Sequence, residues 1–336
     1  MDKARKESKN KIKLKFECME AYFIQNGGIL LKKHIALSQG RDVGSGQLKL
    51  FSYKDIEKAT KNFHPDLLVG CSIHRNVYGA TYDDRTVVVG VPLQQEPNPT
   101  MTDRNLTEAS IAMVMTHDNM LKLYGCCLEN CIPLLVYEFL PNGSLFDHLH
   151  GDLASSNRMN WAGRLRVATD TAYALSYMHN ALRKPLVHRG VNSVCVLLDY
   201  SFHAKLGNFG YSVSITPGDT SERWSVQGTP GYIDPEYIQT RLVTDKCDVY
   251  SFGVLMLELL TGKNPIRMLR DGRDLVDVFV SAMEKSCAMK MIASEILEQA
   301  STDEIQQIAK IALTCVAKKG AERPTMIEVV KQLQQI

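Results

Sequence analysis

The sequence has no apolar run of about 18 residues, which is the length that a membrane-spanning helix needs. It also has almost no net charge, because 39 Lys and Arg face 37 Asp and Glu, and this excludes the strongly basic surface of a nucleic-acid-binding protein. Its nine cysteines lack the paired spacing of a zinc site, so we expect free thiols in a reducing compartment. N-myristoylation requires a glycine after Met1, and that position is Asp2. The sequence therefore predicts a cytoplasmic protein that binds neither nucleic acid nor a metal.

The N-terminal segment is locally basic. Residues 1–15 include seven basic side chains, which are Lys3, Arg5, Lys6, Lys9, Lys11, Lys13 and Lys15. We interpret them as a solvated tail; the alternative is a weak attraction to anionic lipid, ~1 kcal/mol per residue, which would hold the chain at the periphery of the plasma membrane. A short helix is expected over 16–25, ended by Asn26-Gly27-Gly28, with a linker over 40–46. Residues 1–50 are thus predicted to be an extension ahead of one domain over 51–336.

The rest of the chain carries short motifs in a fixed order. They are Gly70, Glu108, Val136-Tyr137-Glu138-Phe139, Asn208-Phe209-Gly210, the stretch 228–236, the stretch 248–253 and Glu322-Arg323-Pro324-Thr325. In this order and spacing they resemble the motifs of protein kinases. The resemblance implies an α+β fold of two lobes, with a β-rich N-lobe over about 51–139 and a helical C-lobe over about 140–336. Helices are expected over 53–62, 106–115, 161–178, 249–260, 275–283, 304–317 and 326–334, and strands over 87–89 and 134–137.

Longer phrases indicate one branch of the kinases. Residues 51–63, which read FSYKDIEKATKNF, and residues 123–129, which read LYGCCLE, resemble plant receptor-like kinase domains. Residues 137–150, which read YEFLPNGSLFDHLH, are similar to wall-associated kinases. A receptor-less member of that branch resembles the plant pseudokinases related to the HopZ-ETI-deficient protein. That family serves as adaptors for a coiled-coil leucine-rich-repeat immune receptor.

The phosphate loop is altered. In kinases it runs G-x-G-x-x-G-x-V, so that bare backbone can approach the phosphates. Here the first glycine, Gly70, and the valine, Val77, are kept, whereas Ser72 and Arg75 replace the other two glycines. Together with Tyr137, which fits the gatekeeper position before the hinge, Gly70 and Val77 are predicted to line a vestigial pocket that holds no cofactor.

The phosphate-binding lysine is absent. No lysine occurs between Lys61 and Lys122, and the resemblance places Gly90 at the lysine position of its strand, or Val91 if the alignment shifts by one residue. Glu108 matches the C-helix glutamate that pairs with this lysine in kinases. Glu108 then either finds Arg75 or another donor, or faces water, and we expect an exposed glutamate.

The base and the metal ligands are replaced as well. In the stretch that resembles the catalytic loop, Gly190 stands at the position of the catalytic Asp, Asn192 at that of the Lys and Cys195 at that of the metal-binding Asn. Asn208 stands where the second metal ligand, an Asp, belongs. A glycine cannot accept a proton, and a neutral amide and a thiol suit Mg²⁺ poorly. The sequence therefore predicts a pseudokinase, which is not an enzyme and binds no nucleotide.

The structural positions of the kinase fold are kept. His188 and Phe209 can stack in the core, and Arg189 matches the arginine that orders a phosphorylated activation segment. Asp248 is expected to brace the backbone of the catalytic loop. Glu236 and Arg323 match the pair that ties the activation segment to the C-lobe.

The segment between Asn208 and Glu236 is rich in hydroxyl groups. They belong to Ser212, Ser214, Thr216, Thr220, Ser221, Ser225 and Thr229. They are either inherited from active kinases or form a surface for modification and docking. Trp224 in the same segment is a candidate anchor for a protein partner, although a buried contact is equally compatible with the sequence.

The resemblance implies an adaptor or decoy in plant innate immunity and the hypersensitive response. The implied partners are a coiled-coil leucine-rich-repeat immune receptor, active receptor-like cytoplasmic kinases and bacterial effector enzymes. One alternative is an allosteric regulator of a receptor-like kinase. The other is an active kinase with displaced groups, which would need a lysine from outside 62–121 and an acid such as Asp199 as base.

Overall fold

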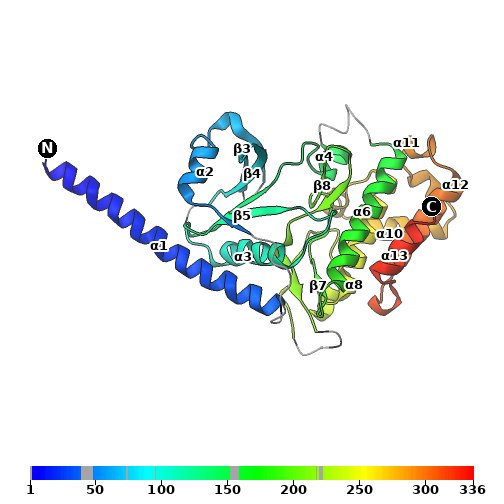
Figure 1. The fold of residues 1–336 in the computed structure, drawn as a ribbon. Helices are drawn as coiled ribbons and strands as arrows, with labels where there is room; N and C mark the ends of the chain where they lie inside the picture. Colours follow the sequence, from blue (N-terminus) through cyan, green and yellow to red (C-terminus); the bar gives the residue numbers. More distant parts are fainter. Residues whose placement is uncertain are drawn as a thin grey trace. The chain divides into compact units, whose positions relative to one another are not determined.

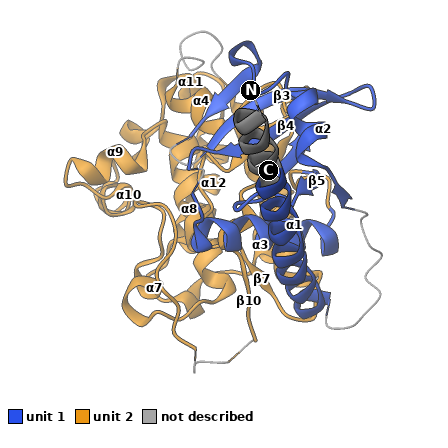
Figure 2. Cartoon of the chain, turned by 90° about the vertical axis from the view of Figure 1, so that its left-hand side faces the viewer, with its two compact units in different colours: residues 1–116, 122–139 blue, residues 117–121, 140–336 orange. Residues whose placement is uncertain are grey.

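A computed structural model describes residues 2–38, 48–72, 75–94, 96–151, 159–216, 218 and 222–336, with the backbone alone for residues 2–12 and 15. Two compact units are present, residues 1–116 with 122–139 and residues 117–121 with 140–336 (Figure 2). The first unit is built on a β-sheet and the second mainly on helices, so the predicted α+β composition is confirmed. None of the helices described is long and apolar enough to cross a membrane.

The first unit contains a six-stranded sheet with the strand order β1-β5-β6-β4-β3-β2. All neighbouring strands run antiparallel except β1 and β5. The strands are β1 Lys49–Leu50, β2 Leu68–Cys71, β3 Arg75–Tyr82, β4 Arg85–Pro92, β5 Leu123–Cys127 and β6 Leu134–Glu138. Asp83 and Asp84 join β3 to β4 with positive φ values of 47° and 59°, as a two-residue hairpin of this twist requires.

The two faces of this sheet differ, because side chains alternate along each strand. One face carries Ala80, Val87, Val89 and Val136, which form a core with Phe51 and Ile56 from the segment around α2 Tyr53–Ala59. The opposite face carries Val77, Gly90 and Leu135, because paired residues point to the same side of the sheet and Gly90 pairs with both Val77 and Leu135. Residues two positions along these strands share that face, and this brings the sequence-distant Arg75 and Tyr137 to the same side as Gly90.

The N-terminal helix is longer than the sequence predicts. Helix α1 Asp2–Ser38 spans 37 residues, so the helix expected over 16–25 does not end at Asn26-Gly27-Gly28. Asn26 is 1% exposed, and its Nδ2 donates to the carbonyl oxygens of Leu128 and Asn130, both at 2.9 Å. These two hydrogen bonds fix the helix to the sheet unit at the point where the glycines would otherwise favour a break.

Helix α1 lies beside α3 Pro99–Val114, as Figure 1 shows. The Lys33 ammonium is 2.7 Å from the Asp103 carboxylate of α3 and donates to the Thr107 hydroxyl at 2.9 Å. Helix α3 begins at Pro99, earlier than the predicted start at residue 106, because the Asn98 side chain caps it by accepting from the Met101 amide. The segment that was predicted to be an extension thus packs on the helix that carries Glu108.

The second unit is mostly helical. Its helices are α4 Leu145–His150, α6 Trp161–Asn180, α7 Pro235–Thr240, α8 Asp245–Thr261, α9 Pro265–Arg270, α10 Leu275–Glu284, α11 Ser294–Leu297, α12 Thr302–Cys315 and α13 Met326–Leu333. Two short ribbons accompany them, β7 Leu186–Val187 with β10 Val213–Ser214 and β8 Val196–Leu198 with β9 Ala204–Leu206. Helix α8 packs closely on α12 at Gly253, where an added Cβ would lie 2.7 Å from the Cβ of Cys315. This contact explains a glycine in the middle of a buried helix.

Candidate functional site

A buried carboxylate holds the loop that matches the catalytic loop. Asp248 of α8 is fully buried and accepts from the backbone amides of His188 at 2.7 Å and Arg189 at 2.8 Å, and from His179 Nε2 at 2.9 Å. Burial alone would raise the pKa of this carboxyl, but the hydrogen bonds and charges of His179 and His188 outweigh it and lower the pKa below its ordinary value. Arg189 has a φ of 65°, a left-handed conformation that these bonds stabilise.

The replaced positions of the loop hydrogen-bond to one another. The Gly190 amide donates to His188 Nδ1 at 3.1 Å, and the Gly190 carbonyl accepts from Asn192 Nδ2 at 2.9 Å and from the Cys195 thiol at 3.2 Å. The Asn192 side chain also donates to the Thr229 hydroxyl at 2.9 Å. The loop thereby keeps a fixed shape and a link to the segment at Thr229.

The two positions that match metal ligands lie in contact. Asn208 Nδ2 donates to the Cys195 sulfur at 3.4 Å, and Asn208 has a left-handed backbone with a φ of 68°. The rings of His188 and Phe209 meet edge to face, with centroids 5.5 Å apart, as the stacking predicted from the sequence requires. This pair supports the backbone that presents Asn208.

In the first unit, Glu108 does not face water. It is 3% exposed, so the prediction of an exposed glutamate is wrong. The cation near it is Arg75, whose Nη1 donates to the Tyr137 hydroxyl at 3.1 Å, and that hydroxyl also hydrogen-bonds with the Glu108 carboxylate. Gly70 and Val77 were predicted to line the vestigial pocket. They pair with each other across β2 and β3, and Val77 follows Arg75 by two residues. The loop residues 73 and 74 lie outside the described residues.

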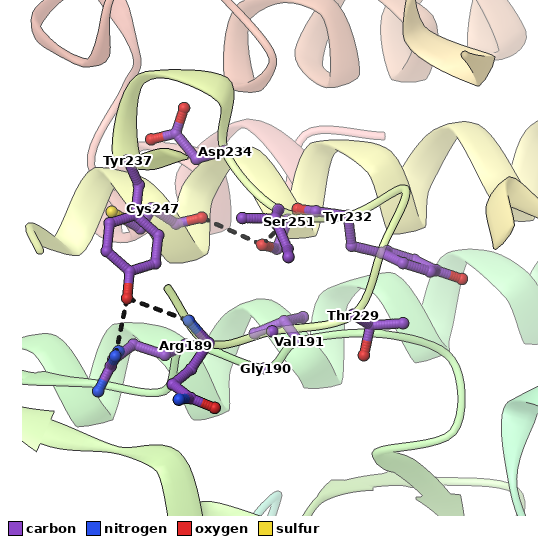
Figure 3. A pocket seen from close by; sticks show the side chains of 12 residues that line it. Arg189, Gly190, Val191, Thr229, Tyr232, Asp234, Tyr237, Cys247 and Ser251 are labelled. Atoms are coloured by element: carbon purple, nitrogen blue, oxygen red, sulfur yellow. Dashed lines mark hydrogen bonds between the residues drawn. The ribbon is translucent and has the colours of Figure 1, made fainter. Parts of the chain in front are cut away.

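Arg189 is occupied by neutral acceptors. Its Nη2 donates to the Ser225 carbonyl and to the Tyr237 hydroxyl, both at 2.7 Å, and its Nη1 donates to the Tyr211 carbonyl at 3.3 Å. The Tyr237 hydroxyl points at Arg189 in Figure 3. The guanidinium also lies 5.3 Å from the Trp224 ring centroid. The arginine that binds a phosphate in many kinases is here held by the unmodified chain.

Trp224 is half-buried and is not a protruding anchor. It packs against the cluster of Val187, Tyr237, Val243 and Cys247. The cavity shown in Figure 3, between Arg189 and Ser251, encloses only about 10 Å³ and has room for about one water molecule. This cavity is therefore too small for a substrate.

The tie to Arg323 runs mainly through a different acid from the one predicted. Arg323 Nη1 and Nη2 both lie 2.7 Å from the two carboxylate oxygens of Asp234, in a buried two-bond pair, whereas Glu236 is 3.9 Å away. Glu236 instead accepts from the Gly320 amide at 2.5 Å. The segment is thus attached at two neighbouring acids.

The hydroxyls of the activation segment fall into different environments. Ser212 is buried and donates to the His188 carbonyl at 3.5 Å, and Thr229 accepts from Asn192. Ser214 and Thr216 follow Ser212 along the segment, and Ser225 is exposed. Thr220 and Ser221, which were also candidates, lie outside the described residues.

The chain is similar to known proteins over most of its length. Residues 69–333 match the family of protein tyrosine and serine/threonine kinases. The chain belongs to this family. It is 38% identical over 317 residues to wall-associated receptor kinase-like 1 of Arabidopsis thaliana, covering 94% of this chain and 43% of that relative. It is 38% identical to wall-associated receptor kinase-like 4 and 36% identical to wall-associated receptor kinase 2 of the same plant, over 95% of this chain and 41% and 43% of those relatives.

This finding corrects the prediction that the chain is not an enzyme. That prediction is wrong, because relatives that match nearly the whole chain at 36–38% identity are receptor kinases and the kinase family model covers most of it. The chain spans about two fifths of the length of these relatives. The changes at Gly90, Gly190, Cys195 and Asn208 remain a feature of the site.

Sequence reasoning missed Asp234 as the partner of Arg323 and underrated Arg75. Asp234 stands two residues before the expected Glu236, and both acids were visible in the motif. Arg75 was interpreted mainly as a replacement for a glycine of the phosphate loop. The signal that would have found it is the strand register, in which Arg75 pairs with Pro92 and therefore lies diagonally next to Gly90.

Proposed function

We propose that this kinase-family domain acts as an adaptor in plant innate immunity. In this proposal it works in the cytoplasm and links a coiled-coil leucine-rich-repeat immune receptor to the activity of bacterial effectors, either on itself or on a bound receptor-like cytoplasmic kinase. Two lines of support are the receptor-like phrases of the sequence and the similarity to plant wall-associated receptor kinases.

One observation carries the proposal, namely how Arg189 is held. In kinases that need phosphorylation, the charge of a phosphate draws this arginine to the activation segment. Here neutral groups of Ser225, Tyr237 and Tyr211 accept hydrogen bonds from its two terminal nitrogens. The described part of the segment around Ser225 is therefore held in place without a phosphate, and a preformed surface loses little conformational freedom when a protein partner binds.

The exposed part of this surface differs from the one that the sequence suggested. Trp224 packs inward, whereas Arg223, Pro230 and Ile238 are exposed, with Ile238 at 45%. Protein interfaces are enriched in arginine and, at their centres, in large apolar side chains. We therefore assign the candidate contact to Arg223 and the outer face of α7 around Ile238.

The experiment is co-purification from plant cells of the tagged full chain and of Ile238→Asp. Ile327→Asp on α13 is the matched control, because Ile327 is 40% exposed on another helix. We expect wild type and Ile327→Asp to recover a coiled-coil leucine-rich-repeat receptor, and Ile238→Asp to recover at least tenfold less, as is common for a central interface residue. Equal recovery by all three would refute the contact. Recovery of a receptor-like kinase without any immune receptor would refute the adaptor function and favour the regulator.

A further inference from the structure

A positive charge occupies the space next to Gly90. A Cβ placed on Gly90 would lie 3.4 Å from both Cδ and Nη1 of Arg75, and 3.7 Å from a ring carbon of Tyr137. The absence of a side chain at residue 90 thus leaves the room that the Arg75 side chain takes. Residues 75 and 90 lie on adjacent strands, β3 and β4, and are diagonal neighbours on one face of the sheet.

The Arg75 guanidinium is held in this place by polar contacts. Burial by itself would lower the pKa of Arg75, but the neighbouring Tyr137 and Glu108 favour the charged form and the pKa is raised overall. Among the described residues, one side-chain hydrogen bond of Arg75 is found, the one to Tyr137, and it uses one of the five N–H donors. The remaining donors are available to the Glu108 carboxylate and to an anion.

Glu108 supplies an independent indication. It is 97% buried, and its Oε2 has no hydrogen-bond partner among the described residues. An isolated buried carboxylate is costly unless a cation compensates it. Arg75 is the cation whose charge interacts with Glu108 in this cluster. The cation comes from the neighbouring strand and is linked to Glu108 through the Tyr137 hydroxyl that lies between them.

We propose that Arg75 has taken over the role of the missing strand lysine. It pairs with Glu108 of α3 and binds the phosphate groups of a nucleoside triphosphate through its free donors. A guanidinium suits this task, because its planar donors match both a carboxylate and a phosphate. The inference does not depend on the proposed adaptor function, and it replaces the expectation, drawn from the absence of a lysine, that the chain binds no nucleotide.

The test measures ATP binding to the full chain by calorimetry and by thermal denaturation, with Mg²⁺ present and absent. We expect a saturable rise in the melting temperature of the wild type with ATP, since a ligand that binds the folded state stabilises it. Arg75→Ala should weaken ATP binding by about tenfold or more, the effect of losing a hydrogen bond to a charged group. Arg75→Lys should keep most of the affinity. The exposed Arg85→Ala, on the same hairpin, should change nothing.

A relocated charge separates a binding role from a purely structural one. In Arg75→Ala/Gly90→Lys the cation returns to β4, and we expect ATP affinity to recover to within a few-fold of wild type. Adenosine has no phosphate, so its affinity should be the same in wild type and Arg75→Ala. The proposal fails if wild type shows no saturable response to ATP, if Arg75→Ala binds ATP as well as wild type, or if Arg75→Ala loses adenosine to the same degree.

Discussion

Replacing Asp248 by Asn should destabilise the second unit strongly. The carboxylate accepts three hydrogen bonds, two of them from the backbone of the loop at His188 and Arg189. Asn keeps one acceptor oxygen but turns its NH₂ group toward a donor, so at least one buried N–H loses its partner. Removing one member of a buried charged network costs about 3–5 kcal/mol, and at roughly 2–4 °C per kcal/mol for a unit of this size we expect the melting temperature to fall by roughly 6–20 °C.

The assay is thermal denaturation followed by circular dichroism for wild type, Asp248→Asn and the control Asp303→Asn, whose side chain is exposed in the first turn of α12. The pH dependence has a definite sign. Because the pKa of Asp248 in the folded state is lower than the ordinary value of 3.8, its stabilising contribution is complete above that pH and is lost as the pH falls through the folded pKa. The difference between wild type and Asp248→Asn should therefore shrink only in strong acid. A loss below 1 °C at neutral pH would refute the reasoning.

Three further outcomes are expected. Trp224→Ala should lower stability by about 1–3 kcal/mol in denaturant unfolding, because the half-buried ring packs on a core cluster and on Arg189; unchanged stability would mean that the ring does not pack there. Asn26→Ala removes two buried hydrogen bonds and should speed hydrogen exchange in α1 by about tenfold or more, unlike the exposed Gln25→Ala; equal exchange in both variants would contradict the docking. In the folded protein at pH 8, Cys18 and Cys71 should react first with a thiol reagent, because they are exposed. Burial raises the pKa of the other four thiols considered, Cys126, Cys127, Cys247 and Cys315, to about 12. Mass spectrometry identifies the labelled residues, and early labelling of the buried thiols would argue against this fold.

The elements that the sequence predicts well have strong local patterns. The β-branched run over 87–89 lies inside β4, which extends to Arg85 and Pro92, and the helices α10 and α13 end within one residue of their predicted ends. Helix α1 was predicted poorly, since a pair of glycines costs about 2 kcal/mol in a helix. Tertiary contacts through Asn26 and Lys33 outweigh that cost, and no local sequence pattern predicts these contacts.

The candidate site divides in the same way. The contacts of Asp248 and the stacking of His188 on Phe209 could be predicted because each of these residues stands in a motif that resembles a kinase motif, and the resemblance supplies the distant partner. The burial of Glu108 and the position of Arg75 could not be predicted, because they depend on the pairing of β3 with β4 and on where α3 packs. Pairing partners far apart in sequence are set by the whole sheet, and a motif search inspects one segment at a time.

The strand pairing at Gly90 has a consequence for how related sequences are compared. An alignment that places residue 90 in one column and residue 75 in another records two separate changes, a lost lysine and a gained arginine. In the folded chain residues 75 and 90 are neighbours, because the Arg75 side chain lies 3.4 Å from where a Cβ of residue 90 would be. A positive charge can therefore move to another sequence position and still occupy the same location in the fold. Relatives that lack the lysine are best compared by whether a basic residue on another strand of the same sheet lies beside the position that corresponds to Gly90.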